Sequence, residues 1–362
     1  MRAVFDEGLA LLAGLNGMPT RAFLTESRCR IDPACSPTLM RVWHDAISTL
    51  GLKPGTTCDL DFHTIPLHGE EALVQTPDVS TRSRRPKGSL ALLAHDADTR
   101  VFCYAHGQLR KEEHHDAMLP CVASWEQRTG QVPQDLLFDS KLTTSANLNR
   151  LNQRHMQFIT VRRRSQQMRA TLAHMPASAW RRVELTHVAR AYRRPRVLDE
   201  QVPLGGYRGS IRQLTVADLG HQAPTGRLTN QLPCAPAAVI ARDAQRMVIE
   251  NSMADGIDFF PMDAWSSAVA MQITCDVQLT LMASSLSRLL GTQIGRGDAA
   301  AKGRHIFRDC IDAVGLITLT ADEIIVRYQK RAHTPLLIAA GFANTHVPVP
   351  WLGGKRLRLV FG

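Results

Sequence analysis

The sequence lacks several features that would place it in a specialised class of protein. It has no apolar run near 18 residues, which excludes a membrane-spanning helix and a membrane partner. Its start, MRAVFDEGLALLAGLNG, places Asp6 and Glu7 before a short apolar run, unlike a secretory signal. The eight cysteines are scattered and contain no CxxC pair, which argues against a disulfide framework or a zinc knuckle. These absences predict a protein with reduced thiols in the cytoplasm.

Lysine is absent from residues 161–230, although this segment is strongly basic. It holds 13 arginines and four acidic residues, so it carries +9 of the chain's formal net charge of +10. Such a cluster can be a solvated face. Arginine without lysine favours phosphate recognition instead, because the guanidinium fork matches phosphate oxygens in pairs. The segment therefore predicts a polyanion partner, most simply nucleic acid, with the run Arg162, Arg163 and Arg164 among the phosphate contacts.

Hydrophobic periodicity and turn residues give an order of elements along the 362 residues. They predict helices within 1–50 and at 110–130, 145–154, 234–260 and 265–291, and strands at 56–65, 89–96, 99–107, 134–139 and 157–163. β-like pieces follow in the arginine-rich segment, and two short strands and a Pro-rich tail lie near the C-terminus. Three hairpin-linked strands, then helix, strand, helix and strand, predict an α/β fold with a ribonuclease-H-like mixed sheet.

The chain is long for one compact core, so several segments are expected. We expect a helical N-terminal segment at 1–52 and the first part of a ribonuclease-H-like catalytic domain at 53–161. An inserted, mainly β subdomain rich in arginine should occupy 162–232, and the second part of the catalytic domain, with C-terminal helices and tail, 233–362.

Four acidic residues lie where this fold gathers functional groups. Asp59 and Asp61 are two apart on the first strand and so share one face. Asp139 ends the fourth strand, and Glu250 lies on the helix after the basic segment. Hard oxygen ligands gathered in one place suit Mg²⁺ or Mn²⁺. A two-metal site of this kind would activate water or a 3′-hydroxyl for phosphoryl transfer.

Each acid also has a purely structural interpretation. Asp139 could cap the next helix, and Asp59 could be a solvated residue at a sheet edge. Glu250 could pair with Arg246, which lies four residues earlier on the same helical face.

Six short blocks resemble those of bacterial insertion-sequence transposases of the DDE type. They are DLDFHTIP, LLFDSKLTT, FITVRRR, GRLTNQ, RMVIEN and DFFPMDAWSS. The likeness is to the branch with a β-rich insertion between the second Asp and the Glu, and it runs from about residue 7 to the C-terminal tail. It implies that Asp61, Asp139 and Glu250 are the catalytic, metal-binding acids, with Mg²⁺ or Mn²⁺ as cofactor. The implied partners are insertion-sequence ends and target DNA, bound by a homodimer in the DNA complex.

The same resemblance implies DNA contacts. Arg246 would hold phosphate together with the three arginines of 162–164. The family's insertion holds aromatic residues against a flipped base, for which Trp180, Tyr192 and Tyr207 are the candidates here. Their other interpretation is that they pack the core of the insertion.

The sequence departs from the family pattern in two ways. The glutamate helix of the family often carries Tyr-x₂-Arg-x₃-Glu-x₆-Lys, but Asp243 stands at the Tyr position and Ile257 at the Lys position. The N-terminal region is also shorter than expected. Two alternatives therefore stay open: an inactive DNA-binding remnant of a transposase, and a ribonuclease-H-like nuclease.

Overall fold

The computed structural model describes most of the chain. The described residues are 7–20, 22–23, 26–27, 30, 32, 35–66, 88–109, 114–186, 193–218, 223–260, 262, 270–295 and 297–362. The chain divides into two compact units, one formed by Met1–Cys35 with Ala283–Gly362 and the other by Ser36–Met282. The four segments expected from the sequence were divided by function, whereas these two units are divided by compactness. The segment boundaries at 52, 161 and 232 remain a prediction.

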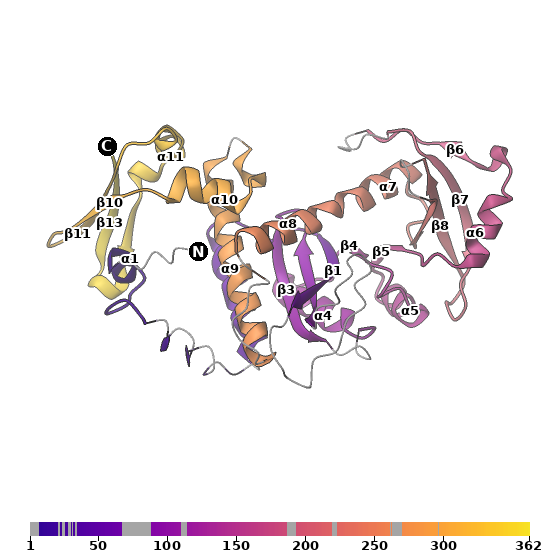
Figure 1. Cartoon of the computed structure of the whole chain (residues 1–362), viewed down its shortest axis with the longest axis horizontal. Coiled ribbons are helices and arrows are strands. Elements are labelled where there is room, and N and C mark those ends of the chain that lie inside the picture. Colours follow the sequence, from indigo (N-terminus) through magenta and orange to yellow (C-terminus); the bar gives the residue numbers. More distant parts are fainter. Residues whose placement is uncertain are drawn as a thin grey trace. The chain divides into compact units, whose positions relative to one another are not determined.

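The unit Ser36–Met282 contains the predicted order of strands and helices (Figure 1). Its strands are β1 (Thr57–Pro66), β2 (Gly88–Asp96), β3 (Val101–Leu109), β4 (Asp135–Phe138), β5 (Gln157–Val161), β6 (Arg181–Arg182), β7 (Arg196–Pro203), β8 (Ser210–Ala217) and β9 (Thr225–Thr229). Its helices are α3 (Ser36–Thr49), α4 (Met118–Thr129), α5 (Ser145–Gln153), α6 (Gln166–Ala173), α7 (Pro236–Gln245), α8 (Met247–Asp258) and the first part of α9 (Ala270–Ile294). The strands predicted between 56 and 163 are confirmed.

These nine strands form one mixed sheet in the order β3-β2-β1-β4-β5-β9-β8-β7-β6. The first three strands are antiparallel neighbours, while β4 runs parallel to β1 and β5 parallel to β4. β9 pairs antiparallel with β5. The strands of the predicted insertion are therefore present, and they continue the main sheet through hydrogen bonds to β5. This pairing covers an edge of β5 that would otherwise expose unpaired backbone groups.

Alternate residues of the central strands supply two cores, one on each face of the sheet. Leu136 and Phe138 pack with Trp125 of α4 and Leu148 of α5. Between them, Leu137 points to the opposite face, where a second cluster includes residues of α7. Because β4 is covered on both faces, its sequence is a continuous apolar run rather than an alternating one.

Two predicted helices differ from their expected bounds. The helix expected at 110–130 begins at Met118 and ends, as predicted, at Gly130, whose left-handed φ of 78° lets its N–H reach Glu126. The helix expected at 234–260 is two helices, α7 and α8, which meet at Arg246. There the backbone bonds span three residues, from Arg246 to Asp243 and from Ile249 to Arg246. Such tight spacing interrupts the four-residue pattern of the α-helix.

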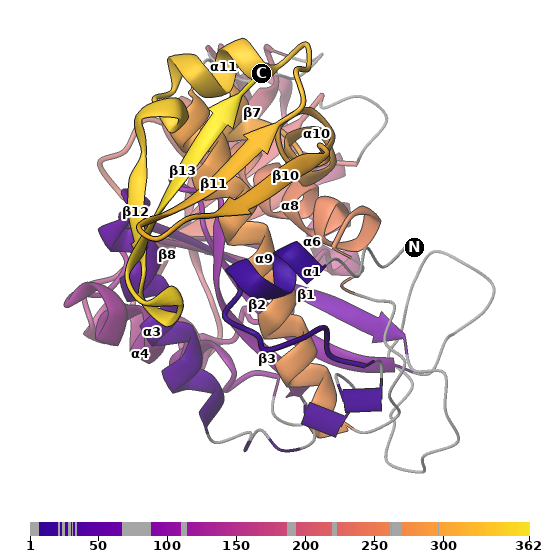
Figure 2. The ribbon, with the colours of Figure 1, turned by 90° about the vertical axis from the view of Figure 1, so that its left-hand side faces the viewer.

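The helix predicted at 265–291 corresponds to α9, and positions 265–269 lie outside the described residues. α9 continues into the second unit, which also contains α1 (Glu7–Leu12), α10 (Gly303–Ile306), α11 (Thr334–Ala339), β10 (Gly315–Leu319), β11 (Glu323–Tyr328), β12 (His346–Val349) and β13 (Lys355–Phe361). Its sheet has the order β10-β11-β13-β12 (Figure 2). The stretch predicted as a Pro-rich tail, 345–354, thus contains strand β12, and β13 follows it.

Two sequence-based expectations concern the whole chain. In the ranges given above, no helix is both long and apolar enough to cross a membrane. Over the same ranges the cysteines form no disulfide.

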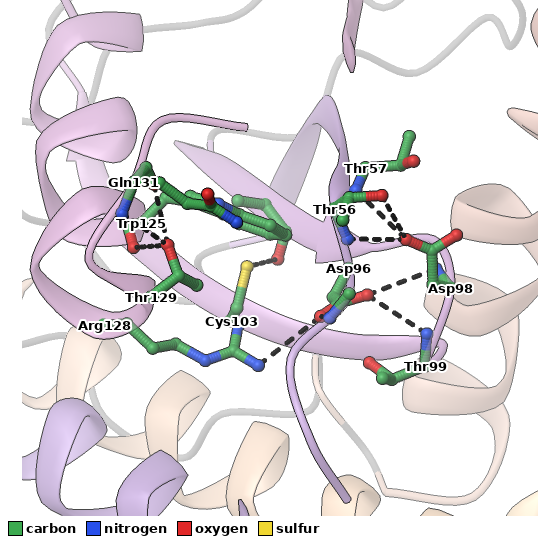
Figure 3. Close-up of polar contacts among 12 residues, drawn as sticks. Thr56, Thr57, Asp96, Asp98, Thr99, Cys103, Trp125, Arg128, Thr129 and Gln131 are labelled. Atoms are coloured by element: carbon green, nitrogen blue, oxygen red, sulfur yellow. Dashed lines mark hydrogen bonds and ion pairs between the residues drawn. The ribbon is translucent and has the colours of Figure 1, made fainter. Parts of the chain in front are cut away.

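Asp96 clamps the turn between β2 and β3 to the segment that precedes β1 (Figure 3). Its side chain is fully buried and accepts the backbone N–H of Gly55 at 2.8 Å. The same carboxylate accepts the N–H groups of Asp98 and Thr99 at 3.2 and 3.1 Å. Arg128 of α4 lies 3.4 Å from it, with only 8% of its side chain exposed. A single carboxylate therefore joins the segment before β1, the turn between β2 and β3, and one buried cation.

We expect Asp96→Asn to lower the free energy of unfolding by about 3 kcal/mol, because it leaves Arg128 buried without its counter-charge. Urea denaturation measures this change. The control is Asp45→Asn, which removes a surface pair with Arg41 in which Asp45 is 56% exposed. The control should change stability by less than about 0.5 kcal/mol. Equal effects would contradict the role of Asp96 as a clamp.

Candidate functional site

The pairing of β1 with β4 sets the positions of two predicted acids. Asp59 of β1 lies opposite Leu137 of β4 in the parallel ladder. Two residues further along each strand come Asp61 and Asp139, the latter directly after the end of β4. Residues at one level of neighbouring parallel strands share a face. The register therefore brings Asp61 and Asp139 to the same level of the sheet.

The electrostatic surroundings of Asp61 involve all three predicted acids. Burial raises the pKa of Asp61 above its ordinary value, Arg246 opposes this rise, and the negative charges of Asp139 and Glu250 add to it. The nearest cation is Arg246, whose guanidinium lies 3.0 Å from the Asp61 carboxylate. Both side chains are only about one-seventh exposed, at 15% and 14%. Acids from two other elements of the fold therefore affect the pKa of Asp61.

Asp139 is not a helix cap. The cap of α5 is Thr144, whose side chain accepts the backbone N–H of Asn147. The Asp139 side chain instead accepts the N–H of Ser140 at 2.5 Å, and its backbone oxygen accepts the Thr143 hydroxyl at 3.4 Å. These bonds hold the carboxylate in the turn that follows β4, so the capping interpretation is wrong.

Glu250 lies exposed in the first turn of α8. Its expected structural partner was Arg246, one helical turn earlier. In the described part of the chain, the ion pair of Arg246 is with Asp61 and none joins it to Glu250. The Glu250 carboxylate therefore stays available to a ligand.

Asp59 has a different environment from Asp61. It is fully buried, and its carboxylate lies 2.5 Å from the guanidinium of Arg242 on α7. Burial raises the pKa of Asp59, and the nearby Arg242 lowers it. The interpretation of Asp59 as a solvated edge residue is therefore wrong.

Asp61, Asp139 and Glu250 fit a hard divalent cation in chemical type, since each offers carboxylate oxygens. The negative charges of Asp139 and Glu250 destabilise the ionised form of Asp61, which a cation would offset. Within the described ranges, no three His, Cys, Asp or Glu side chains gather closely enough to hold a metal ion. In this arrangement the positive charge facing Asp61 is that of Arg246.

The two departures from the family pattern have structural roles. Asp243 is buried on α7 and forms an ion pair with Arg227 of β9 at 2.8 Å. Ile257 packs against the core that includes Ile249 and Met253 of the same helix. Both positions therefore contribute to holding α7 and α8 on the sheet.

Part of the arginine excess is used inside the protein. Internal ion pairs join Arg196 to Asp218, Arg212 to Asp199, and Arg227 to Asp243. Arg212, with 7% of its side chain exposed, also donates to the backbone oxygens of Gln231, Leu232 and Cys234. These arginines are committed to structure.

Other arginines remain at the surface. Arg162 donates to the side-chain oxygen of Gln213, and Arg164 donates to the hydroxyl of Thr225 at 2.9 Å. Arg163 is exposed and has no hydrogen-bond or ion-pair partner among the residues with described positions. In those same ranges, exposed arginines of the segment without an acidic partner are Arg163, Arg164, Arg169, Arg181, Arg193 and Arg208.

The candidate stacking residues differ in their availability. Trp180 is partly buried, and the guanidinium of Arg196 lies 5.5 Å from its ring centre. The hydroxyl of Tyr207 accepts a hydrogen bond from Asn152, and its ring packs against the main core. Tyr207 is therefore structural, and Tyr192 lies outside the described residues.

Comparisons with known proteins give little. No protein-family model and no curated protein matches the chain. Among solved structures, the cryo-EM structure of a piggyBac transposase synaptic complex with hairpin DNA aligns at 12% identity and a TM-score of 0.43. The alignment covers 84% of this chain and 65% of that chain, so this chain spans less than two thirds of its length. A likeness at this TM-score carries no argument about fold or function.

The division between internal and surface arginines predicts a large effect on stability for the first kind and a small effect for the second. Arg212→Ala should lower the free energy of unfolding by about 3 kcal/mol or more, because it leaves Asp199 and three carbonyl groups without their donor. Arg163→Ala should change it by less than about 0.5 kcal/mol. Urea denaturation of both variants measures the difference. A small effect of Arg212→Ala would show that its ion pair contributes nothing to the fold.

Proposed function

We propose that the chain is a DNA transposase of the DDE type. It would cleave phosphodiester bonds at the ends of an insertion sequence and join the freed 3′ ends to target DNA. The carrying observation is the placement of Asp61 level with Asp139 in the sheet, together with the effect of both Asp139 and Glu250 on its charge. Asp139 and Glu250, which come from separate elements, both act on the carboxylate of Asp61, and carboxylate oxygens are the ligands that hard divalent cations prefer.

The sheet supports a ribonuclease-H-like assignment within this proposal. Its first five strands have the order β3-β2-β1-β4-β5, with an antiparallel first half and a parallel second half. The first strand, the end of the fourth and the helix after the insertion carry the three acids.

The roles of the acids follow from their chemistry. Asp61, Asp139 and Glu250 would hold Mg²⁺ or Mn²⁺, which when bound would activate a water or 3′-hydroxyl and stabilise the leaving oxygen. The guanidinium of Arg246 lies beside Asp61, where a phosphate of the substrate would meet it. Arg246 would then hold that phosphate by paired hydrogen bonds.

DNA is the proposed partner because exposed arginines lie beyond β5, in loops, on α6 and on β6. Arg163 and Arg164 directly follow β5, and Arg181 lies on β6 at the edge of the sheet. Trp180 adjoins this edge strand, so it is the aromatic candidate that we retain for base contact. We further propose that two copies of the chain act together on DNA, in the cytoplasm.

A specific observation favours a second candidate, a DNA-binding remnant without activity. Asp61 already faces Arg246, and Asp243 serves structure where the family often has tyrosine. Cleavage of DNA that carries the inverted repeats flanking the gene separates this remnant from an enzyme. Strand-transfer products would further separate a transposase from a nuclease of the same fold.

We expect Asp139→Ala and Glu250→Ala each to reduce Mg²⁺-dependent cleavage of such DNA by more than about 100-fold, the upper range for lost outer partners of metal sites. DNA binding should persist, because a ligand to the cation acts mainly on the transition state. Gel analysis of cleavage and a binding titration measure the two effects. Asp258→Ala, an exposed acid at the end of the same helix, should keep activity. Cleavage that survives Glu250→Ala would remove Glu250 from the site.

DNA affinity should fall steeply with salt, since each phosphate contact releases counterions. Arg163→Ala should reduce the slope of log K against log salt by about one unit on duplex DNA. Fluorescence anisotropy at several salt concentrations gives the slope. The control is Arg41→Ala on α3, a surface arginine paired with Asp45, which should leave the slope unchanged. Equal slopes for wild type and Arg163→Ala would place Arg163 away from DNA.

A further inference from the structure

Helix α7 carries two adjacent residues of opposite charge, and each is buried against an opposite charge on the sheet. Arg242 pairs with Asp59 of β1 at 2.5 Å. Asp243 pairs with Arg227 of β9 at 2.8 Å. In the sheet, β1 and β9 are separated by β4 and β5. The two pairs therefore attach one turn of α7 to two distant strands.

The pair with β1 is in register with the candidate site. Arg246 follows Arg242 by one helical turn, and Asp61 follows Asp59 by two residues on the same face of β1. Two ion pairs, Arg242 with Asp59 and Arg246 with Asp61, thus connect the same strand to the end of α7 and the start of α8. Glu250 lies one turn beyond Arg246, so its position over β1 depends on this attachment.

The pair of Asp59 with Arg242 is poorly suited to a purely stabilising role. Asp59 is fully buried and the Arg242 side chain is 15% exposed. Among the described residues, Asp59 Oδ2 and Arg242 Nη1 are both buried and have no hydrogen-bond partner. A buried ion pair with unsatisfied atoms gains little over apolar side chains of similar size. The pair is better explained by the geometry that it imposes, since it fixes α7 relative to β1.

We propose that Asp59 and Arg242 are positioning residues, which hold the start of α8 against β1 so that Glu250 is presented to Asp61 and Asp139. Neither residue binds the cation or the DNA. The functional meaning of this role rests on the proposed transposase activity, whereas the attachment of α8 does not. Asp59 is unsuited to be a ligand because it is fully buried and its nearer oxygen is already engaged by Arg242.

The test replaces the pair with apolar side chains, as Asp59→Leu with Arg242→Met in the full chain. The double substitution avoids an unpaired buried charge, so the global midpoint of urea unfolding should stay the same or rise. Hydrogen–deuterium exchange of the backbone amides in α8, Met247–Asp258, should become at least about tenfold faster. The affinity for Mn²⁺, followed by electron paramagnetic resonance, should weaken by about 10- to 100-fold, as for other outer partners of metal ligands.

The matched control is Arg227→Met with Asp243→Leu, which removes the neighbouring buried pair of α7 from β9 rather than from β1. In the control, exchange in α8 and affinity for Mn²⁺ should stay within about twofold of wild type, less than the tenfold lower limit for an outer partner. Arg242→Lys alone keeps a positive charge beside Asp59. This variant should therefore keep most of the slow exchange in α8.

The readouts separate this inference from the proposed function. Unchanged exchange in α8 after replacement of Asp59 and Arg242 would overturn the positioning role. Loss of Mn²⁺ binding with unchanged exchange would overturn it in favour of Asp59 as a direct ligand. A wild-type protein that neither binds Mn²⁺ nor cleaves DNA would overturn the proposed function, while faster exchange in α8 would still support the attachment.

Discussion

The parallel pairing of β4 with β1 is the constraint on which the candidate site depends. It fixes the level of Asp139 relative to Asp61, because parallel neighbours keep one register along their shared length. β4 is covered on both faces, which explains its continuous apolar run. The run stops at Asp139 because the chain leaves the core there and turns toward α5. The carboxylate at this point is partly exposed, and it accepts the N–H of the next residue.

Arginine has two different uses in this fold. Arg212, Arg227 and Arg242 are largely buried, and each meets an aspartate on another strand or helix. The fork of the guanidinium group suits it to such pairs, because it can donate to a carboxylate and to backbone oxygens together. Several surface arginines beyond β5 have no acidic partner in the described part of the chain. Part of the high arginine count therefore stabilises the fold, and only the remainder could serve the proposed binding of a polyanion.

The failures of prediction have physical causes that lie outside local sequence. The break at Arg246 was missed because apolar residues continue on both sides of it, while the side chain that marks the break reaches a partner on β1. The strand β12 was missed because Pro348 and Pro350 favour an irregular tail, whereas β12 is an edge strand that tolerates proline. The continuation of the main sheet through β9 could not be foreseen, since pairing between β5 and β9 joins residues far apart in sequence.

The sequence by itself determined the order of the first five strands and their helices, the net charge of the segment 161–230, and the acids that are candidate ligands. These follow from periodicity, turn residues and composition, which are local properties. Only the tertiary structure decided which acid faces which cation. Asp59 and Arg242 are 183 residues apart, and two aspartates on one face of β1 look equivalent in sequence. They became different because the helix above them presents one arginine to each, one deep in the core and one beside Asp139 and Glu250.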